Sequence, residues 1–321
     1  MTKVYYDRTM SPKVINWIQS KYKWIIDYVK KHPELDFQTG SNNKSSWFSV
    51  YRGTSRVLSI KPSGKAEAAQ KYMNLCPEFY RSPTPVLFDL LLEKVHNDPS
   101  FDQYYENRDL NQKKEGYYQT LIGRRYSFEI RGNDDFLIFD KEMVIGFDNT
   151  LIKNTWNQPI KDEIARLIQE ARIEFGKTKL PQDIHDSYGE FDFLALNWKG
   201  DIIIMELKQN DPQKTYLSPF QICYYKKQFE RLLEELPELY GGIKKMIEEK
   251  RQLGILNIPS DHMIPSKLSG KVKYYLIVGE EHELSEEVCR RFHVIKSIAL
   301  PELEAFTCNK EGTLTPSKKL I

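Results

Sequence analysis

The chain has 321 residues, 29% charged residues and a formal net charge of +2. This length favours two domains, and the mixed charge lacks the strong basicity that would by itself indicate nucleic-acid binding. No apolar run is long enough to span a membrane, residues 1–10 lack a signal-peptide core, and the four cysteines show no metal-binding spacing. We therefore expect a soluble cytoplasmic protein with no membrane partner.

Residues 1–130 predict an α+β domain that recognises a substrate, binds a partner protein or forms a homo-oligomer. Its expected elements are a helix, a hairpin that turns at Gly53, and two further helices, at residues 14–29, 47–60, 85–96 and 110–121. Aromatic and basic side chains of the hairpin could contact bases and phosphates, although core packing is the favoured interpretation: Trp47, Tyr51, Arg52 and Arg56.

Residues 131–321 predict a second domain in which strands alternate with helices around a mixed β-sheet. Residues 136–147 predict a second hairpin or a pair of strands. Residues 159–175 read as an amphipathic helix whose apolar stripe is Ile160, Ile164, Leu167, Ile168, Ala171 and Phe175. Further along the chain we expect a loop at 254–270, a strand at 271–279, a helix at 283–292 and a strand at 293–300.

Residues 188–210 predict a β-hairpin with charged side chains gathered at one end. The loop Trp198-Lys199-Gly200 suits a turn that ends in the left-handed region, where glycine costs least. With Asn197 opposite Asp201, Asp192 faces Glu206 and Glu190 faces Lys208. Alternate residues on the other face are apolar and fit for burial: Phe191, Phe193, Ala195, Ile203, Met205 and Leu207.

Opposed carboxylates repel, so Asp192 facing Glu206 indicates a positive group between them. A hard divalent cation, Mg²⁺ or alternatively Mn²⁺, takes oxygen ligands and keeps several waters. Lys208 would orient a water molecule or stabilise charge on a phosphate. The alternative is a structural ion pair at a strand end, which we weigh as less favoured than a site.

The following helix, expected at residues 218–233, contains Gln221 and Tyr225 on one face. A structural interpretation is also open, because Ser218 fits the N-cap, Pro219 the first helical position and Gln221 the capping box.

Asp192 followed by Glu206-Leu207-Lys208 resembles the D…(D/E)-x-K signature of the PD-(D/E)XK nuclease superfamily, and Gln221-x-x-x-Tyr225 resembles the extra motif of its RecB-like exonuclease branch. The resemblance covers residues 145–300. It implies a restriction-endonuclease-like fold and Mg²⁺-dependent hydrolysis of DNA. It also implies metal binding by Asp192, Glu206 and the Leu207 carbonyl.

The resemblance further implies a glutamate on the first core helix, for which Glu163 is the candidate and Glu170 the second choice; Glu163 could equally favour the helix N-terminus. Gln221 and Tyr225 would support the site or contact substrate. Basic residues close to it in sequence are further candidates for substrate binding: Lys214, Lys226 and Lys227, with Lys177 and Lys179. Two other functions stay open, an inactive nucleic-acid- or protein-binding module on the same fold and a nuclease that acts on RNA.

Overall fold

The structure is a computed structural model and describes residues 4–41, 46–110, 112–176, 180, 190–209, 211–279 and 284–320. It confirms the predicted α/β class. The chain divides into two compact units. The hairpin unit contains Met1–Tyr6, Asp140–Tyr240 and Ile264–Ile321, and the companion unit contains Asp7–Phe139 and Gly241–Met263. In the described part of the chain, no helix combines the length and the apolar character that crossing a membrane requires.

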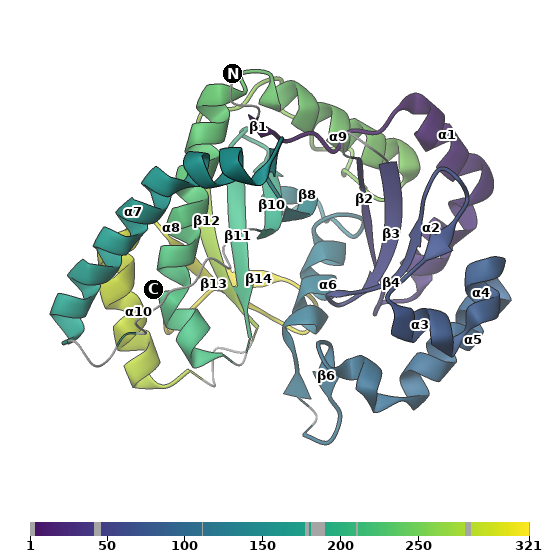
Figure 1. The fold of residues 1–321 in the computed structure, drawn as a ribbon, viewed down its shortest axis with the longest axis horizontal. Helices are drawn as coiled ribbons and strands as arrows, with labels where there is room; N and C mark the ends of the chain where they lie inside the picture. The colour runs from purple at the N-terminus through teal and green to yellow at the C-terminus, as the bar shows by residue number, and fades with distance from the viewer. Residues whose placement is uncertain are drawn as a thin grey trace. The chain divides into compact units, whose positions relative to one another are not determined.

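The hairpin unit is built on a sheet with the strand order β14-β13-β12-β11-β10-β8 (Figure 1). In chain order these strands are β8 (Phe136–Met143), β10 (Phe191–Asn197), β11 (Ile202–Lys208), β12 (Val272–Val278), β13 (Glu304–Cys308) and β14 (Leu314–Pro316). β10 and β11 are antiparallel, whereas β11, β12 and β13 are parallel. A separate short pair joins β1 (Val4–Tyr5) to β9 (Gly146–Phe147).

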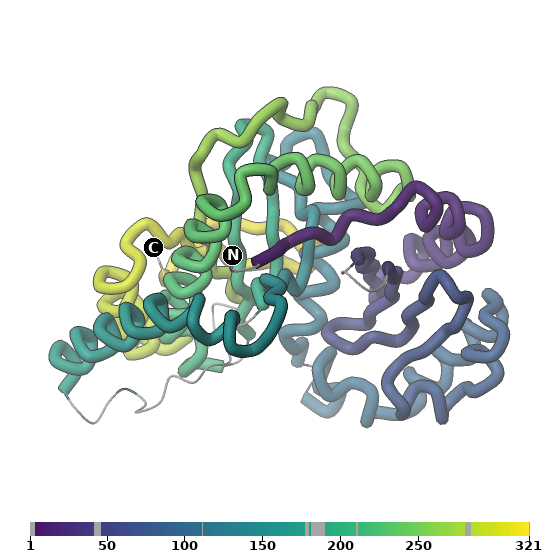
Figure 2. The backbone as a smooth tube through the Cα atoms, turned by 45° about the horizontal axis from the view of Figure 1, so that its top comes forward, coloured from purple at the N-terminus to yellow at the C-terminus, as the bar shows by residue number. Residues whose placement is uncertain are grey.

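Three helices of this unit, α7 (Thr150–Phe175), α8 (Pro212–Glu235) and α10 (Glu286–Ala299), pack side by side, and α8 lies against β11 and β12 (Figures 1 and 2). The apolar stripe predicted for residues 159–175 is buried in α7, which confirms it. The predicted strand at 293–300 is wrong, because α10 continues to Ala299. Its buried residues Phe292, Ile295 and Ala299 recur at helical spacing, and the run of β-branched residues concealed that period.

Helix α8 begins earlier than predicted, at Pro212. The Asp211 side chain caps it by accepting a hydrogen bond from the Lys214 amide at 2.9 Å. Pro219 therefore lies inside the helix, where it removes one backbone donor. The Ser218 hydroxyl compensates by donating to the Thr215 carbonyl at 2.7 Å. The capping interpretation of Gln221 is consequently wrong.

The companion unit has a sheet with the strand order β2-β3-β4-β5. Residues of its strands and helices form a hydrophobic core, to which Leu253 and Ile255 also belong. The strands are β2 (Asp36–Ser41), β3 (Ser46–Arg52), β4 (Ser55–Ile60) and β5 (Ala66–Glu67), with the short pair β6 (Glu106–Asn107) and β7 (Gln112–Lys113). The helices are α1 (Pro12–Lys21), α2 (Lys23–Lys31), α3 (Gln70–Leu75), α4 (Pro77–Arg81), α5 (Pro85–Asn97), η1 (Pro99–Asp102) and α6 (Glu115–Arg125). Helix α9 (Leu239–Leu253) starts in the hairpin unit and continues in this one.

The predicted hairpin at residues 47–60 is confirmed as β3 and β4, with Gly53 at φ 61° in its turn. The predicted helix at 85–96 is confirmed as α5, and the helix expected at 110–121 starts later, at Glu115. The single helix predicted at 14–29 is wrong, because the chain breaks at Tyr22. That break lets the Tyr22 ring pack 4.9 Å from Trp17 and 5.5 Å from Phe48, measured between ring centroids.

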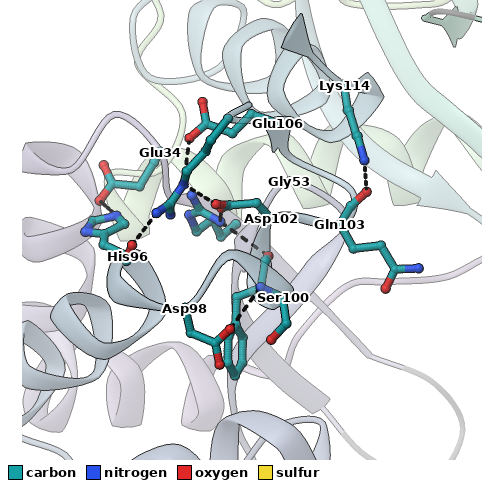
Figure 3. A network of polar contacts seen from close by, with 12 residues as sticks. Glu34, Gly53, His96, Asp98, Ser100, Asp102, Gln103, Glu106 and Lys114 are labelled. Atoms are coloured by element: carbon teal, nitrogen blue, oxygen red, sulfur yellow. Dashed lines mark hydrogen bonds and ion pairs between the residues drawn. The ribbon is translucent and has the colours of Figure 1, made fainter. Parts of the chain in front are cut away.

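Arg52 is buried in the companion unit and forms an ion pair with Asp102 at 2.7 Å. Asp102 also binds Arg108, which in turn contacts Glu106 and the carbonyl of His96 (Figure 3). The Arg52 guanidinium lies 4.2 Å from the centre of the Tyr105 ring. These contacts make Arg52 part of the core, which was the favoured interpretation for this side chain.

Candidate active site

The hairpin β10–β11 has the register that its turn predicts. Phe193 pairs with Met205 and Leu196 with Ile202. At the turn, the Asn197 amide donates to the Asp201 carbonyl at 3.0 Å, and Gly200 has a φ of 90°. One step beyond Phe193 and Met205, the same register places Asp192 opposite Glu206. The apolar face of the hairpin is buried, as predicted: Phe191, Phe193, Ala195, Ile203, Met205 and Leu207.

Asp192, Glu206 and Lys208 meet at the end of this hairpin. The Asp192 carboxylate accepts a hydrogen bond from the Leu207 amide at 2.7 Å and lies opposite Glu206 in the hairpin register. The Lys208 ammonium pairs with Glu206 Oε1. The side chains of Glu206 and Lys208 are only 3% and 7% exposed. The protein therefore holds two carboxylates and one ammonium in a setting that excludes most water.

Burial raises the pKa of the Asp192 carboxyl above its ordinary value of 3.8, although the Lys208 ammonium and the Leu207 amide oppose this effect. Asp192 is half-buried, and its carboxylate faces that of Glu206 across the hairpin. A bound cation would offset the negative charge of these two carboxylates.

Gln221 and Tyr225 of α8 extend the contacts of this site. The Gln221 amide nitrogen donates to Glu206 Oε1 at 2.7 Å and to the Tyr225 hydroxyl at 2.7 Å. That hydroxyl donates to the Glu190 carbonyl at 2.6 Å, while the Glu190 side chain is exposed. The two residues of the Q-x-x-x-Y motif thus connect β11, α8 and the start of β10. The expected gathering of Glu190 with the other carboxylates is not seen.

Glu163 lies away from the carboxylates. Its side chain forms an ion pair with Lys227 at 3.1 Å, and Lys227 lies about 9 Å beyond Gln221 along α8, at about 1.5 Å per residue. This pair raises the pKa of the Lys227 ammonium. Glu170, the second candidate, pairs with Arg166 at 3.0 Å on the surface of α7. The structure therefore does not bring either glutamate to the hairpin end.

The predicted basic residues have carboxylate partners of their own. Lys226 pairs with Glu302 and Glu230, and Lys227 pairs with Glu163. Lys214 is more exposed and lies 3.4 Å from Asp211. Lys177 and Lys179 lie outside the described residues. Of Lys214, Lys226 and Lys227, Lys214 has the most exposed side chain and is therefore the best placed to contact a phosphate from solvent.

The contact between the Leu207 amide and Asp192 was not predicted from the sequence. The amide is a main-chain group, and its availability depends on where the ladder between β10 and β11 ends. The register offers one signal, because Asp192 comes just before Phe193, where the pairing of β10 with β11 begins. At such a ladder end, a backbone donor can pair with a side chain.

No group of three or more His, Cys, Asp and Glu side chains suited to a metal ion occurs among the described residues. Magnesium sites commonly use only one or two protein carboxylates together with water and substrate phosphate oxygens. Asp192 and Glu206 supply a donor set of that kind, with hard oxygen ligands. No family model, curated protein or solved structure matches this chain.

Proposed function

We propose that the chain is a metal-dependent nuclease that hydrolyses phosphodiester bonds of DNA. One observation carries the proposal: Glu206 and Lys208 form a buried ion pair at the end of a buried hairpin, and Asp192 faces Glu206 across that hairpin. Placing charged groups together in a buried setting costs stability, so an arrangement of this kind is a candidate functional site. The antiparallel pair β10–β11 beside parallel β12 supports a restriction-endonuclease-like fold for the hairpin unit.

Magnesium, with manganese as the alternative, fits the donor set of Asp192 and Glu206. Both carboxylates are hard oxygen ligands, and the raised pKa of Asp192 indicates an environment that a cation would relieve. The Leu207 carbonyl is a further candidate ligand. When bound, such an ion would stabilise negative charge on the phosphate group and activate a water molecule.

Side chains of the protein would supply the other catalytic and positioning roles. Lys208 would orient the attacking water and offset the negative charge that develops on the phosphate oxygens. Gln221 holds Glu206 Oε1 at 2.7 Å, and Tyr225 holds Gln221, so these two side chains would position Glu206. The water oxygen bonds to phosphorus while the bond from phosphorus to the leaving oxygen breaks. One water proton stays with the new phosphate group, and the other is transferred to the leaving oxygen.

The test is cleavage of linear, nicked and circular DNA in the presence of Mg²⁺, with RNA of the same sequence beside them. Lys208→Ala should lower the rate by about 10²–10³-fold, the loss seen when one preorganised charge-stabilising donor is removed. Lys199→Ala is the matched control, because Lys199 lies in the turn at the other end of the same hairpin.

Equal rates of cleavage by the parent and by Lys208→Ala would show that Lys208 has no catalytic role. If the parent binds DNA without cutting it, the chain is a binding module on this fold. Faster cleavage of RNA than of DNA would reassign the substrate.

A further inference from the structure

A column of stacked aromatic rings in the companion unit ends at the surface. The Phe79 ring stacks on Phe88 with 4.8 Å between centroids, and Phe88 stacks on Tyr28 at 4.6 Å. Tyr28 in turn stacks on His32 at 4.1 Å, with only 15° between the ring planes. His32 and Phe88 are not in ring contact with each other, so they cover opposite faces of Tyr28. His32 is therefore the outermost ring of the column.

The three inner rings are buried, whereas the His32 side chain is 31% exposed. Tyr28 covers one face of the His32 ring, so the exposed part of this side chain lies at its other face and its edge. Among the described residues, no second aromatic ring packs on His32. A planar ligand could therefore extend the column by stacking on His32.

The position of the His32 ring is fixed from both sides. The His32 carbonyl, at the end of α2, accepts from Arg124 Nη1 at 3.1 Å and from the Leu35 amide at 3.0 Å. One turn earlier in α2, the Tyr28 hydroxyl donates to Asp89 at 2.5 Å. A ring that is already held in place loses little conformational entropy when a ligand stacks on it.

Glu34 places a carboxylate beside this ring. Its Oε1 atom lies 3.8 Å from His32 Nδ1 and 3.7 Å from His96 Nε2 (Figure 3). Both distances exceed the range of a hydrogen bond, and the described part of the chain gives this carboxylate no other hydrogen-bond donor. The Glu34 side chain is 18% exposed. Its two oxygens can therefore accept hydrogen bonds from a ligand.

We propose that His32 and Glu34 bind an unpaired nucleobase of a single-stranded nucleic acid. Bases splayed out of a single strand stack on aromatic side chains, histidine included, and are recognised by hydrogen bonds along their Watson–Crick edges. All residues of this site belong to the companion unit, and none is a candidate catalytic residue.

The carboxylate determines which base fits best. A carboxylate only accepts hydrogen bonds, so Glu34 favours a base that presents adjacent N–H donors on its Watson–Crick edge. Guanine has two such donors side by side, on N1 and on N2, whereas thymine has one, on N3. A base stacked on His32 would turn this edge toward Glu34. The site should therefore prefer guanine to thymine.

The experiment measures binding of short fluorescent single strands by anisotropy, with the full chain in EDTA so that no metal-dependent cleavage occurs. One strand is oligothymidine with a central guanine, and the other has thymine throughout. The guanine strand should bind more tightly. An RNA strand of the same design and free guanosine monophosphate are titrated beside them, and the tightest binder identifies the source of the base.

Three variants test the two side chains. His32→Ala should weaken binding about five- to 150-fold, because it removes a ring on which a base stacks. His32→Phe keeps a stacking ring and should bind within about threefold of the wild type. Glu34→Gln should abolish the preference for guanine, because an amide replaces one of the two acceptors by a donor.

His293→Ala and Glu93→Gln are the matched controls. His293 is also partly exposed beside an aromatic ring, but it meets Phe292 edge to face, at 70°. Glu93 is an exposed carboxylate on α5. Both variants should bind like the wild type. Circular dichroism of each variant excludes unfolding as the cause of a change.

The inference is overturned if the wild-type chain binds neither strand nor guanosine monophosphate, or if His32→Ala binds like His293→Ala. It is also overturned if folded His32→Phe binds as weakly as His32→Ala. A guanine preference that persists in Glu34→Gln would reject base recognition by this carboxylate. Because binding is measured without metal, loss of the nucleobase site would leave the proposed nuclease standing, and absence of cleavage would leave the nucleobase site standing.

Discussion

Glu206 is the residue on which the candidate active site converges. Its Oε1 atom accepts from both Lys208 and Gln221, and Asp192 lies opposite it in the hairpin register. These partners come from both strands of one hairpin and from a helix. A buried carboxylate with several polar partners has a fixed position, which is what a metal ligand requires. Asp192 is half-buried, and burial raises the pKa of its carboxyl.

Asp192→Asn tests this assignment through folding stability. If Asp192 binds Mg²⁺, the ion should raise the free energy of unfolding of the wild type by about 2.7 kcal/mol at a hundredfold excess over its Kd, and should stabilise the variant much less. Thermal unfolding with and without Mg²⁺ measures both effects. Asp201→Asn, at the turn of the same hairpin, is the control. An equal Mg²⁺ effect in wild type and Asp192→Asn would contradict metal binding by this side chain.

At the scale of elements, α7 and α8 are joined by a buried polar contact. Asn157 Oδ1 accepts from the Tyr224 hydroxyl at 2.9 Å and from the Gln228 amide at 2.6 Å. Nearby, the Arg231 guanidinium lies 4.8 Å from the Trp156 ring and donates to the Trp156 carbonyl. Because α8 also carries Gln221 and Tyr225, these contacts help to set the position of the motif relative to β11.

Asn157→Ala should lower the free energy of unfolding by about 2–6 kcal/mol, because it removes the acceptor of two buried donors, and each unsatisfied donor costs about 1–3 kcal/mol. Urea denaturation measures the change. Gln158→Ala is the matched control: that side chain is exposed and pairs with Asp162, so its loss should stay within about 0.5 kcal/mol. Similar values for the two variants would show that the Asn157 contact is not important for stability.

At the scale of the whole molecule, each of the two units is built from segments that are not continuous in the sequence. The predicted boundary at residue 130 separates two continuous domains, whereas Met1–Tyr6 belongs to the hairpin unit and Gly241–Met263 to the companion unit. Within the companion unit, Glu249 accepts from the Met10 amide at 2.8 Å, and the Asn257 amide donates to the Ser127 carbonyl at 2.9 Å. The segment from 241 is therefore built into that unit.

Glu249 should make stability depend on pH. Burial raises the pKa of this carboxyl above 4.5, although the Met10 amide and Lys245 oppose the effect. A raised folded-state pKa means that the carboxyl favours folding most below pH 4.5, and that this contribution is lost as the pH rises through the folded-state value. The side chain that Glu249→Gln introduces does not titrate. The melting temperature of this variant, relative to that of the wild type, should therefore rise between pH 4 and pH 7.

Melting temperatures measured across this pH range test the prediction, with Glu248→Gln as the neighbouring exposed control. A constant difference between Glu249→Gln and the wild type would show that burial of Glu249 has no energetic effect.

The sequence alone determined features that depend on neighbouring residues. The Trp198-Lys199-Gly200 turn set the hairpin register, because Gly200 takes the left-handed conformation at low cost. Alternation predicted one buried face of β10 and β11, and the structure buries the other face of β11 as well. Helical spacing identified the buried stripe of α7. Where β-branched residues concealed the helical period, as in α10, the prediction failed.

Only the tertiary structure decided which charged side chains meet. Glu163 was a candidate metal ligand by position, yet packing of α7 on α8 pairs it with Lys227. A turn or a periodic face is set by local backbone geometry, whereas an ion pair between distant elements depends on how those elements pack.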